Sequence, residues 1–238
     1  MKIDLLAIVA HPDDAELTCG GTLLKAAAAG YATGILDLTR GETGTRGSAE
    51  IRLREAARAA RILRLRVRRN LGLPDARLRV SEEYRDAIAA VIRELAPRTV
   101  ILPYWEERHP DHAAASALGY EACFVAGLKS YDLPGQPFRP AKILYATAFG
   151  DARPDIAVDI SHHFARRRRA ILAFASQFRP PSRERRSRVP IPLDDLEERM
   201  AIQARVYGRM IGVRYAEGYA VKEAIQVEDV VTMPVRSI

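Results

Sequence analysis

The chain has 238 residues, a net charge of +7 and 48% hydrophobic residues, a composition typical of a soluble globular protein. No apolar run approaches the ~20 residues that a membrane helix needs, and the first residues show no signal-peptide pattern, so we expect no membrane association. Two cysteines, Cys19 and Cys123, are too few for a disulfide framework and favour a cytoplasmic protein. No linker rich in Gly, Ser or Pro divides the chain, which predicts a single domain over 1–238.

The positive charge comes almost entirely from arginine, which supplies 32 of the 37 basic residues. Such an excess occurs in proteins that bind nucleic acid, membranes or small anionic substrates. No nucleic-acid motif accompanies the charge, so we predict no nucleic-acid partner. A non-catalytic nucleotide- or nucleic-acid-binding protein is the alternative of another class, although the first strand–helix turn lacks the G-x-G-x-x-G pattern.

Strands and helices are expected to alternate along the first half of the chain. The strands are predicted over 3–10, 32–38, 66–71 and 99–102, and the helices over 15–29, 50–63, 81–95 and 111–126. This alternation predicts the α/β class, with a Rossmann-like, doubly wound, mostly parallel sheet and helices on both faces. The last third is less regular, with strands at 142–149 and 156–159, helices at 160–178 and 194–211, and a surface loop at 179–192.

Three of these helices carry more detailed expectations. Ser81 and Asp111 are predicted to cap the helices that follow them. The inward face of helix 50–63 is predicted to hold apolar residues at helical spacing, namely Leu53, Ala56, Ala57, Ala60 and Leu63.

Polar motifs follow two of the predicted strands. His11-Pro12-Asp13-Asp14 comes directly after the first strand, and His109-Pro110-Asp111-His112 follows the fourth. Taken alone, Asp13 or Asp14 would be an ordinary helix N-cap. Strands one and four are possible neighbours in a doubly wound sheet, where ligands bind at the carboxyl ends of the strands. The pair of motifs therefore favours one shared site.

The residue types in these motifs indicate a catalytic metal. Two histidines and one carboxylate with an open position form a common catalytic zinc set, which His11, Asp14 and His112 supply. The same donors accept Fe2+ or Mn2+, so the identity of the metal stays open.

The remaining motif residues suit hydrolysis. A carboxylate near the metal, Asp13, is predicted to take the proton of water. His109 is predicted to stabilise the oxyanion as an imidazolium and to protonate the leaving amine. A hydrogen bond from His109 to Asp111 is expected to raise the pKa of that imidazole. Activity would then fall at alkaline pH.

A glycine-rich loop over 39–47 follows the second predicted strand. One interpretation is a plain connection. The other is an anion-binding loop in which Arg40, Arg46 and backbone N–H groups meet the substrate.

Segments along nearly the whole chain resemble the PIG-L/LmbE-like family of zinc-dependent N-acetylglucosaminyl deacetylases. The resemblance rests on AHPDDAELTCGGT at 10–22, LTRGETGTRG at 38–47, NLGLPDARL at 70–78, RHPDH at 108–112, SQF at 176–178 and YAEGY at 215–219. The second segment and Trp105 are most similar to the bacillithiol-biosynthesis branch, whose substrate is N-acetylglucosaminyl malate. Other acetylated sugars, inositol-linked, lipid-linked or chito-oligosaccharide, are the alternative substrates.

The resemblance also implies roles for individual residues and for the assembly. It implies zinc on the three ligands named above, Asp13 as the base, His109 as the stabilising cation and Asp111 as its partner. It implies substrate contact by Arg52 and a homo-oligomer. Some relatives place a tyrosine shortly before the second histidine motif or near the C-terminal helix to help bind the oxyanion. Here Glu107 stands two residues before His109, and Tyr207 is a loose candidate for that tyrosine.

Overall fold

A seven-stranded mixed sheet forms the centre of the computed structural model, which describes residues 2–148, 152–178, 196–233 and 235. The strand order is β3-β2-β1-β4-β5-β7-β6. The first five strands are parallel, whereas β7 runs antiparallel to both of its neighbours. The strands are β1 (Leu5–Val9), β2 (Thr33–Thr39), β3 (Val67–Leu73), β4 (Thr99–Pro103), β5 (Lys142–Ala146), β6 (Ile156–Asp159) and β7 (Ala216–Ala220).

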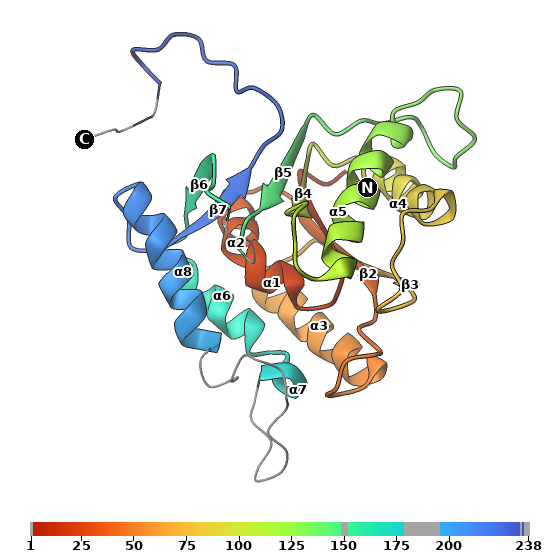
Figure 1. Cartoon of the computed structure of the whole chain (residues 1–238), viewed down its shortest axis with the longest axis horizontal. Helices are drawn as coiled ribbons and strands as arrows, with labels where there is room; N and C mark the ends of the chain where they lie inside the picture. The colour runs from red at the N-terminus through yellow and green to blue at the C-terminus, as the bar shows by residue number, and fades with distance from the viewer. Residues whose placement is uncertain (1, 149–151, 179–195, 234, 236–238) are drawn as a thin grey trace.

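Helices cover both faces of this sheet (Figure 1). They are α1 (Asp14–Thr18), α2 (Gly20–Ala28), α3 (Ala49–Leu63), α4 (Glu82–Leu95), α5 (Pro110–Ala126), α6 (Phe164–Ile171), α7 (Ala175–Phe178) and α8 (Leu196–Met210). Side chains of a strand alternate between its two faces. Accordingly Leu6 and Ile8 of β1 pack in the core cluster that holds α4 and α5, while Leu5, Ala7 and Val9 pack in the cluster that holds α2. The expected α/β architecture is confirmed.

The topology brings the two polar motifs together. β1 lies between β2 and β4 and is parallel to both, with Leu5 opposite Thr99 and Ala7 opposite Ile101. The chain leaves the carboxyl ends of β1 and β4 through the turns that carry the histidine motifs. The predicted neighbourhood of strands one and four is therefore confirmed.

Several predicted boundaries are wrong. The helix expected over 15–29 is two helices that meet at Cys19, and the one expected over 160–178 ends at Ile171 before the short α7. The cap of α5 is His109 rather than Asp111, since the His109 side chain accepts from the backbone N–H of Asp111. Ser81 does cap α4 as predicted. The fifth strand stops at Ala146, β7 was not predicted, and the loop at 179–192 lies outside the described residues.

The buried face of α3 also differs from the prediction. Leu53 is 63% exposed, whereas the charged Arg52 and Glu55 are buried. Glu55 accepts hydrogen bonds from the backbone N–H and the hydroxyl of Ser176, at 2.7 Å each. A buried charge is tolerated where such partners replace water. Ala56 and Leu63 are buried as predicted, whereas Ala57 is exposed like Leu53, so apolar spacing alone located only part of the inward face.

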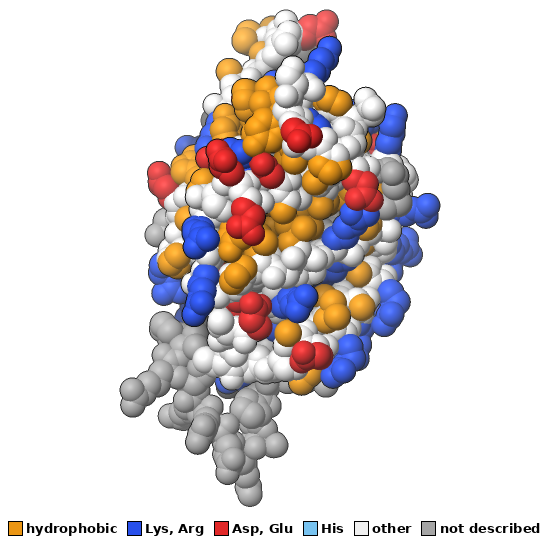
Figure 2. Space-filling model, turned by 90° about the vertical axis from the view of Figure 1, so that its right-hand side faces the viewer, with side chains coloured by type: hydrophobic (Ala, Val, Ile, Leu, Met, Phe, Trp, Pro, Cys, Tyr) orange, Lys and Arg blue, Asp and Glu red, His pale blue; other side chains and the backbone are white. Residues whose placement is uncertain are grey.

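The surface beside α4 mixes the two signs of charge. In the view of Figure 2, acidic side chains lie between basic ones, and hydrophobic side chains are scattered among them. This face carries no continuous basic stripe. Within the described part of the chain, no helix combines the length and the apolar character that a bilayer crossing requires.

Candidate metal and catalytic site

The turn after β1 has an unusual backbone that directs its carboxylates. Asp13 has φ of 105°, a left-handed conformation that costs a non-glycine residue ~1–3 kcal/mol. Asp13 occupies the N-cap position of α1, but its side chain makes no capping hydrogen bond. The carboxylate of Asp14 accepts from the backbone N–H of His11 at 2.8 Å. The two aspartates are therefore not ordinary N-caps.

The side chains of His11, Asp14 and His112 converge beside the carboxyl ends of β1 and β4. The Oδ2 atom of Asp14 lies 3.3 Å from Nδ1 of His11 and 3.3 Å from Nε2 of His112. One ligand atom from each of the three lies within 4.8 Å of the others. Two imidazoles and a carboxylate are a donor set that suits a divalent transition metal, so the residues present fit the predicted ion.

The charges of these three groups are strongly coupled. Burial would lower the pKa of His11, but the charge of Asp14 and contact with Asp75 raise it to about 11. Burial would likewise lower the pKa of His112, but the charge of Asp14 raises it to about 10. Although burial favours the neutral acid, the two histidines hold the pKa of Asp14 well below its ordinary value. A bound cation would take the place of the protons on the histidines.

Further carboxylates lie behind both histidines. The Nε2 atom of His11 is 3.0 Å from Oδ1 of Asp75 and 3.3 Å from Oδ2 of Asp111. The Nδ1 atom of His112 lies 3.9 Å from Oε2 of Glu107. Carboxylates in this position fix the orientation of a metal-binding imidazole. Sequence reasoning gave neither Asp75 nor Glu107 a role, although Asp75 follows the carboxyl end of β3 at the same edge of the sheet.

Asp13 is held by Arg52. The Nη2 atom of Arg52 donates to Oδ1 of Asp13 at 3.1 Å and to the carbonyl of Pro12 at 2.6 Å, while Nη1 donates to the carbonyl of Gly41 at 3.0 Å. Burial raises the pKa of Asp13 to about 7, against the opposing charge of Arg52. Arg52 was expected to contact substrate. In the structure it is buried and orients the carboxylate of Asp13.

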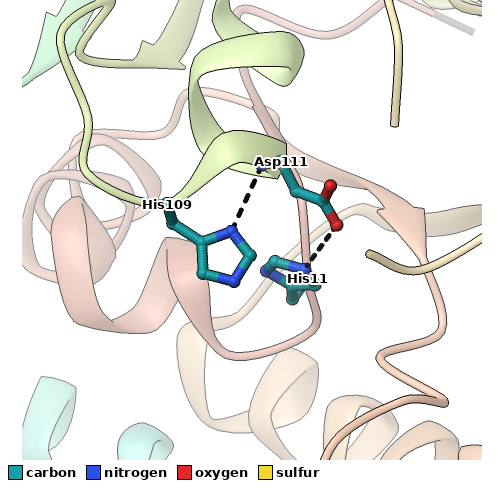
Figure 3. A group of neighbouring side chains, drawn as sticks. All are labelled: His11, His109 and Asp111. Carbon is teal, nitrogen blue, oxygen red and sulfur yellow. Dashed lines mark hydrogen bonds and ion pairs between the residues drawn. The ribbon is translucent and has the colours of Figure 1, made fainter. Parts of the chain in front are cut away.

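His109 and Asp111 interact differently from the expectation (Figure 3). The backbone N–H of Asp111 donates to Nδ1 of His109 at 3.2 Å. The carboxylate of Asp111 instead accepts from the backbone N–H of Ala76 at 2.8 Å and of Leu78 at 3.3 Å, and it contacts His11. Burial and the charges of His112 and His11 lower the pKa of His109, which favours the neutral imidazole. The expected hydrogen bond from the His109 ring to the Asp111 carboxylate is therefore replaced by one in which His109 accepts from the backbone of Asp111.

The remaining predicted residues lie at the rim or elsewhere. Arg40 is exposed on the loop after β2, close to Gly72, and Arg46 is half-buried further along that loop. The hydroxyl of Tyr207 donates to the carbonyl of Thr147 at 3.0 Å, on the side of α8 and β7. Tyr207 is thus engaged in a contact outside the histidine cluster.

Histidines and carboxylates thus gather at the switch point of a doubly wound sheet, where proteins of this architecture bind their ligands. The family model described as "PIG-L: GlcNAc-PI de-N-acetylase" matches residues 6–123, which contain both histidine motifs. The chain belongs to this family, a conclusion that the relatives below support over most of its length.

Three similar proteins extend the comparison. A diacetylchitobiose deacetylase of Thermococcus kodakarensis is 34% identical over 90% of this chain and 81% of its own length. The "Probable N-acetyl-alpha-D-glucosaminyl L-malate deacetylase 2" of Bacillus anthracis is 29% identical over 73% of this chain and 81% of that protein. The crystal structure of the conserved protein TT1542 from Thermus thermophilus has a TM-score of 0.84 and 41% identity, and covers 95% of this chain and 98% of its own.

Proposed function

We propose that this protein is a metal-dependent N-deacetylase that hydrolyses the acetamide of an N-acetylglucosaminyl conjugate. The observation that carries the proposal is the convergence of His11, Asp14 and His112 beside the buried carboxylate of Asp13. Relatives in the same family deacetylate acetylated sugars. We therefore assign the deacetylation of such a sugar to the histidine cluster of this chain.

The three converging residues would hold the ion, and zinc is the first candidate, with Fe2+ and Mn2+ as alternatives. When bound, a divalent ion lowers the pKa of a water ligand from ~15.7 toward ~7 and polarises the acetyl carbonyl. Three carboxylates, those of Asp14, Asp75 and Asp111, contact the single imidazole of His11. This excess of negative charge favours a cation at the site.

Asp13 is the proposed general base. A pKa of about 7 places this carboxylate where a base works best near neutral pH. It would accept the proton of the attacking water as the oxygen bonds to the acetyl carbon. The protonated Asp13 would then return that proton to the sugar nitrogen as the C–N bond breaks, leaving acetate and a free amine. Arg52 would orient the carboxylate for both transfers.

His109 is the proposed oxyanion donor. Its Nδ1 accepts from the backbone of Asp111, so the proton resides on Nε2. The ring stacks on His112, with centroids 4.8 Å apart, at the exposed mouth of the site. A neutral imidazole can donate a hydrogen bond to a developing oxyanion. This role needs no positive charge on His109.

N-acetylglucosaminyl malate is the substrate we propose first. Arg40 and Arg46 on the loop at the rim offer guanidinium groups that suit the two malate carboxylates. A chito-oligosaccharide is the second candidate, because the relative from Thermococcus kodakarensis acts on diacetylchitobiose. We also propose a cytoplasmic homo-oligomer that acts on this small molecule, as the family resemblance implies.

The test is release of free amine from each candidate by zinc-loaded protein, with a chelated sample as control. Turnover of N-acetylglucosaminyl malate well above that of diacetylchitobiose supports the first substrate. The reverse order moves the assignment to chito-oligosaccharides. Metal-loaded protein that releases no amine from any acetylated sugar would overturn the proposed reaction.

A further inference from the structure

Asp75 lies between the glycine-rich loop and the proposed metal ligand His11. Asp75 is only 6% exposed, in the turn that follows β3. The Nδ1 atom of His11 lies 3.3 Å from Asp14, whereas the other ring nitrogen, Nε2, lies on the side of Asp75 and Asp111. That nitrogen lies 3.0 Å from Oδ1 of Asp75, the shortest of the contacts between the His11 ring and a carboxylate.

The other oxygen of Asp75 is committed to the loop. Oδ2 accepts from the backbone N–H of Thr43 at 2.8 Å and from its hydroxyl at 2.6 Å. The backbone N–H of Asp75 donates to Oε1 of Glu42 at 2.9 Å. One buried carboxylate therefore joins the loop at 41–47 to the imidazole of His11, with a separate oxygen for each partner.

Asp111 does not duplicate this connection. Its carboxylate also lies near Nε2 of His11, at 3.3 Å, but it is fixed by the backbone N–H groups of Ala76 and Leu78 rather than by the loop. Ala76 has φ of 58°, and its N–H donates to Asp75 at 2.9 Å as well as to Asp111. This shared donor lies between two carboxylates that would otherwise repel each other. Of these two carboxylates, Asp75 is the one that contacts the loop, through Thr43.

The same loop also reaches the proposed base. The carbonyl of Gly41 accepts from Arg52, which in turn donates to Asp13. The loop is thus tied to the metal ligand through Thr43 and Asp75, and to the base through Gly41 and Arg52. A ligand that moves the loop would act on both halves of the site.

We propose that Asp75 is a positioning residue that couples the loop at 41–47, through Thr43, to the orientation of His11 and hence to metal affinity. The proposal rests on the metal site proposed above. Coupling between two sites is reciprocal, so an occupant of the loop that strengthens the Thr43–Asp75 contact also tightens the metal. Outer partners of this kind typically contribute ~10–100-fold to metal affinity.

The experiment compares zinc dissociation constants, measured by competition with a chromogenic chelator, and the d–d absorption spectra of the cobalt-loaded proteins. Asp75→Asn places an amide N–H group or a weaker acceptor opposite Nε2 of His11, so we expect zinc affinity to fall ~10–100-fold and the cobalt spectrum to shift. Thr43→Val removes only the hydroxyl donor and should give a smaller loss in the same direction. Thr43→Ser keeps that donor and should restore the wild-type values.

Thr45→Val is the matched control, since Thr45 is exposed two residues along the same loop. It should leave affinity and spectrum unchanged. Wild-type values in both Asp75→Asn and Thr43→Val, with zinc bound by the parent protein, would overturn the coupling and leave the metal site intact. Failure of the parent protein to bind zinc would instead overturn the metal site itself. If Asp75→Asn does not fold, the Thr43 pair decides the result.

Discussion

Two clusters of buried charge flank the first helices of the chain, and they differ in how their charges are satisfied. Glu217 of β7 accepts from the backbone N–H groups of Gly21 and Thr22 at 2.8 and 2.7 Å, from the Thr22 hydroxyl at 2.7 Å, and pairs with Arg167 at 3.0 Å. Each oxygen thus has its donors. This cluster fastens β7 and α6 to α2 and has the character of a structural joint.

The histidine cluster is built the opposite way. Asp14, Asp75 and Asp111 all contact His11, and Asp13 lies beside them with its pKa raised to about 7. Carboxylates crowd around the imidazoles, and Arg52 forms an ion pair with one of them, Asp13. We infer that a buried charge with a full set of partners stabilises the fold, whereas buried like charges that crowd together indicate a place for a ligand.

The largest expected effect is on catalysis. Asparagine tolerates left-handed φ values, so Asp13→Asn should preserve the turn while removing the base. We expect kcat to fall ~10²–10⁴-fold with zinc content unchanged. Initial rates and metal analysis on the same sample make the test. Near-normal turnover would remove Asp13 from the base role.

The same substitution should also remove one pH dependence of stability. The pKa of Asp13 is higher in the folded protein than its ordinary value of 3.8, so the folded state binds this proton more tightly. The contribution to stability is therefore present at low pH and is lost as pH rises toward about 7. The free energy of unfolding of the metal-free parent should therefore fall between pH 3.8 and about 7 more steeply than that of metal-free Asp13→Asn, and an equal pH dependence in the two proteins would contradict the raised pKa.

Loss of a proposed ligand should act on the metal rather than on the fold. His112→Ala removes one of three converging donors, so zinc affinity should fall by more than the ~10–100-fold of an outer partner. His162→Ala, on an exposed histidine outside the cluster, is the control. Equal zinc occupancy in the His112 variant and the control would refute the ligand assignment.

Glu217→Gln should lower the stability of the fold and leave the metal site unchanged. It leaves the buried Arg167 without its counter-charge, so we expect a loss of ~3–5 kcal/mol in the free energy of unfolding. Zinc affinity and kcat of the folded fraction should stay at parental values. Denaturant titration and turnover measured side by side separate the two clusters. If Glu217→Gln keeps the parental stability but loses zinc, Glu217 supports the metal site rather than the fold.

The pH profile gives a smaller but diagnostic effect. Because Asp13 must be ionised to accept a proton, kcat/KM should rise up to about tenfold per pH unit below a midpoint near its pKa of about 7 and then level off. A neutral His109 adds no alkaline loss, in contrast to the expectation from the sequence. A decline at alkaline pH that disappears in His109→Gln would restore the imidazolium role.

The smallest effect is expected at the rim. Arg40→Gln should raise KM for N-acetylglucosaminyl malate about 5–30-fold through loss of one charge-assisted contact of ~1–2 kcal/mol, and should leave KM for diacetylchitobiose unchanged. Equal effects on the two substrates would detach Arg40 from recognition of the malate group.

The fold was most predictable where elements that follow one another in the chain also lie side by side in the sheet. The alternation of strands and helices through Ala126 is local, and right-handed parallel connections leave few arrangements. That made the neighbourhood of β1 and β4 predictable, and with it the meeting of His11 and His112. The antiparallel β7 escaped prediction, because Tyr219 and Ala220 pair with residues far back in the chain.

The residues that contact the proposed ligands and the proposed base were only partly predictable from the sequence. The rule that drew attention to His11 applies equally to Asp75, which follows β3 at the same sheet edge. The exchange of partners at Asp111 could not be foreseen, since it depends on Ala76 adopting a left-handed backbone. The buried orientation of Arg52 likewise depends on three acceptors contributed by different loops.

On the function proposed above, one metal ion held by the histidine cluster enables removal of an acetyl group from a sugar. The most direct measurement is the rate of amine release from N-acetylglucosaminyl malate and from diacetylchitobiose as zinc is removed and returned in measured amounts. The rate should follow zinc up to one ion per chain, vanish in the chelated protein and return on reloading. A rate that is unaffected by complete removal of metal would contradict the account.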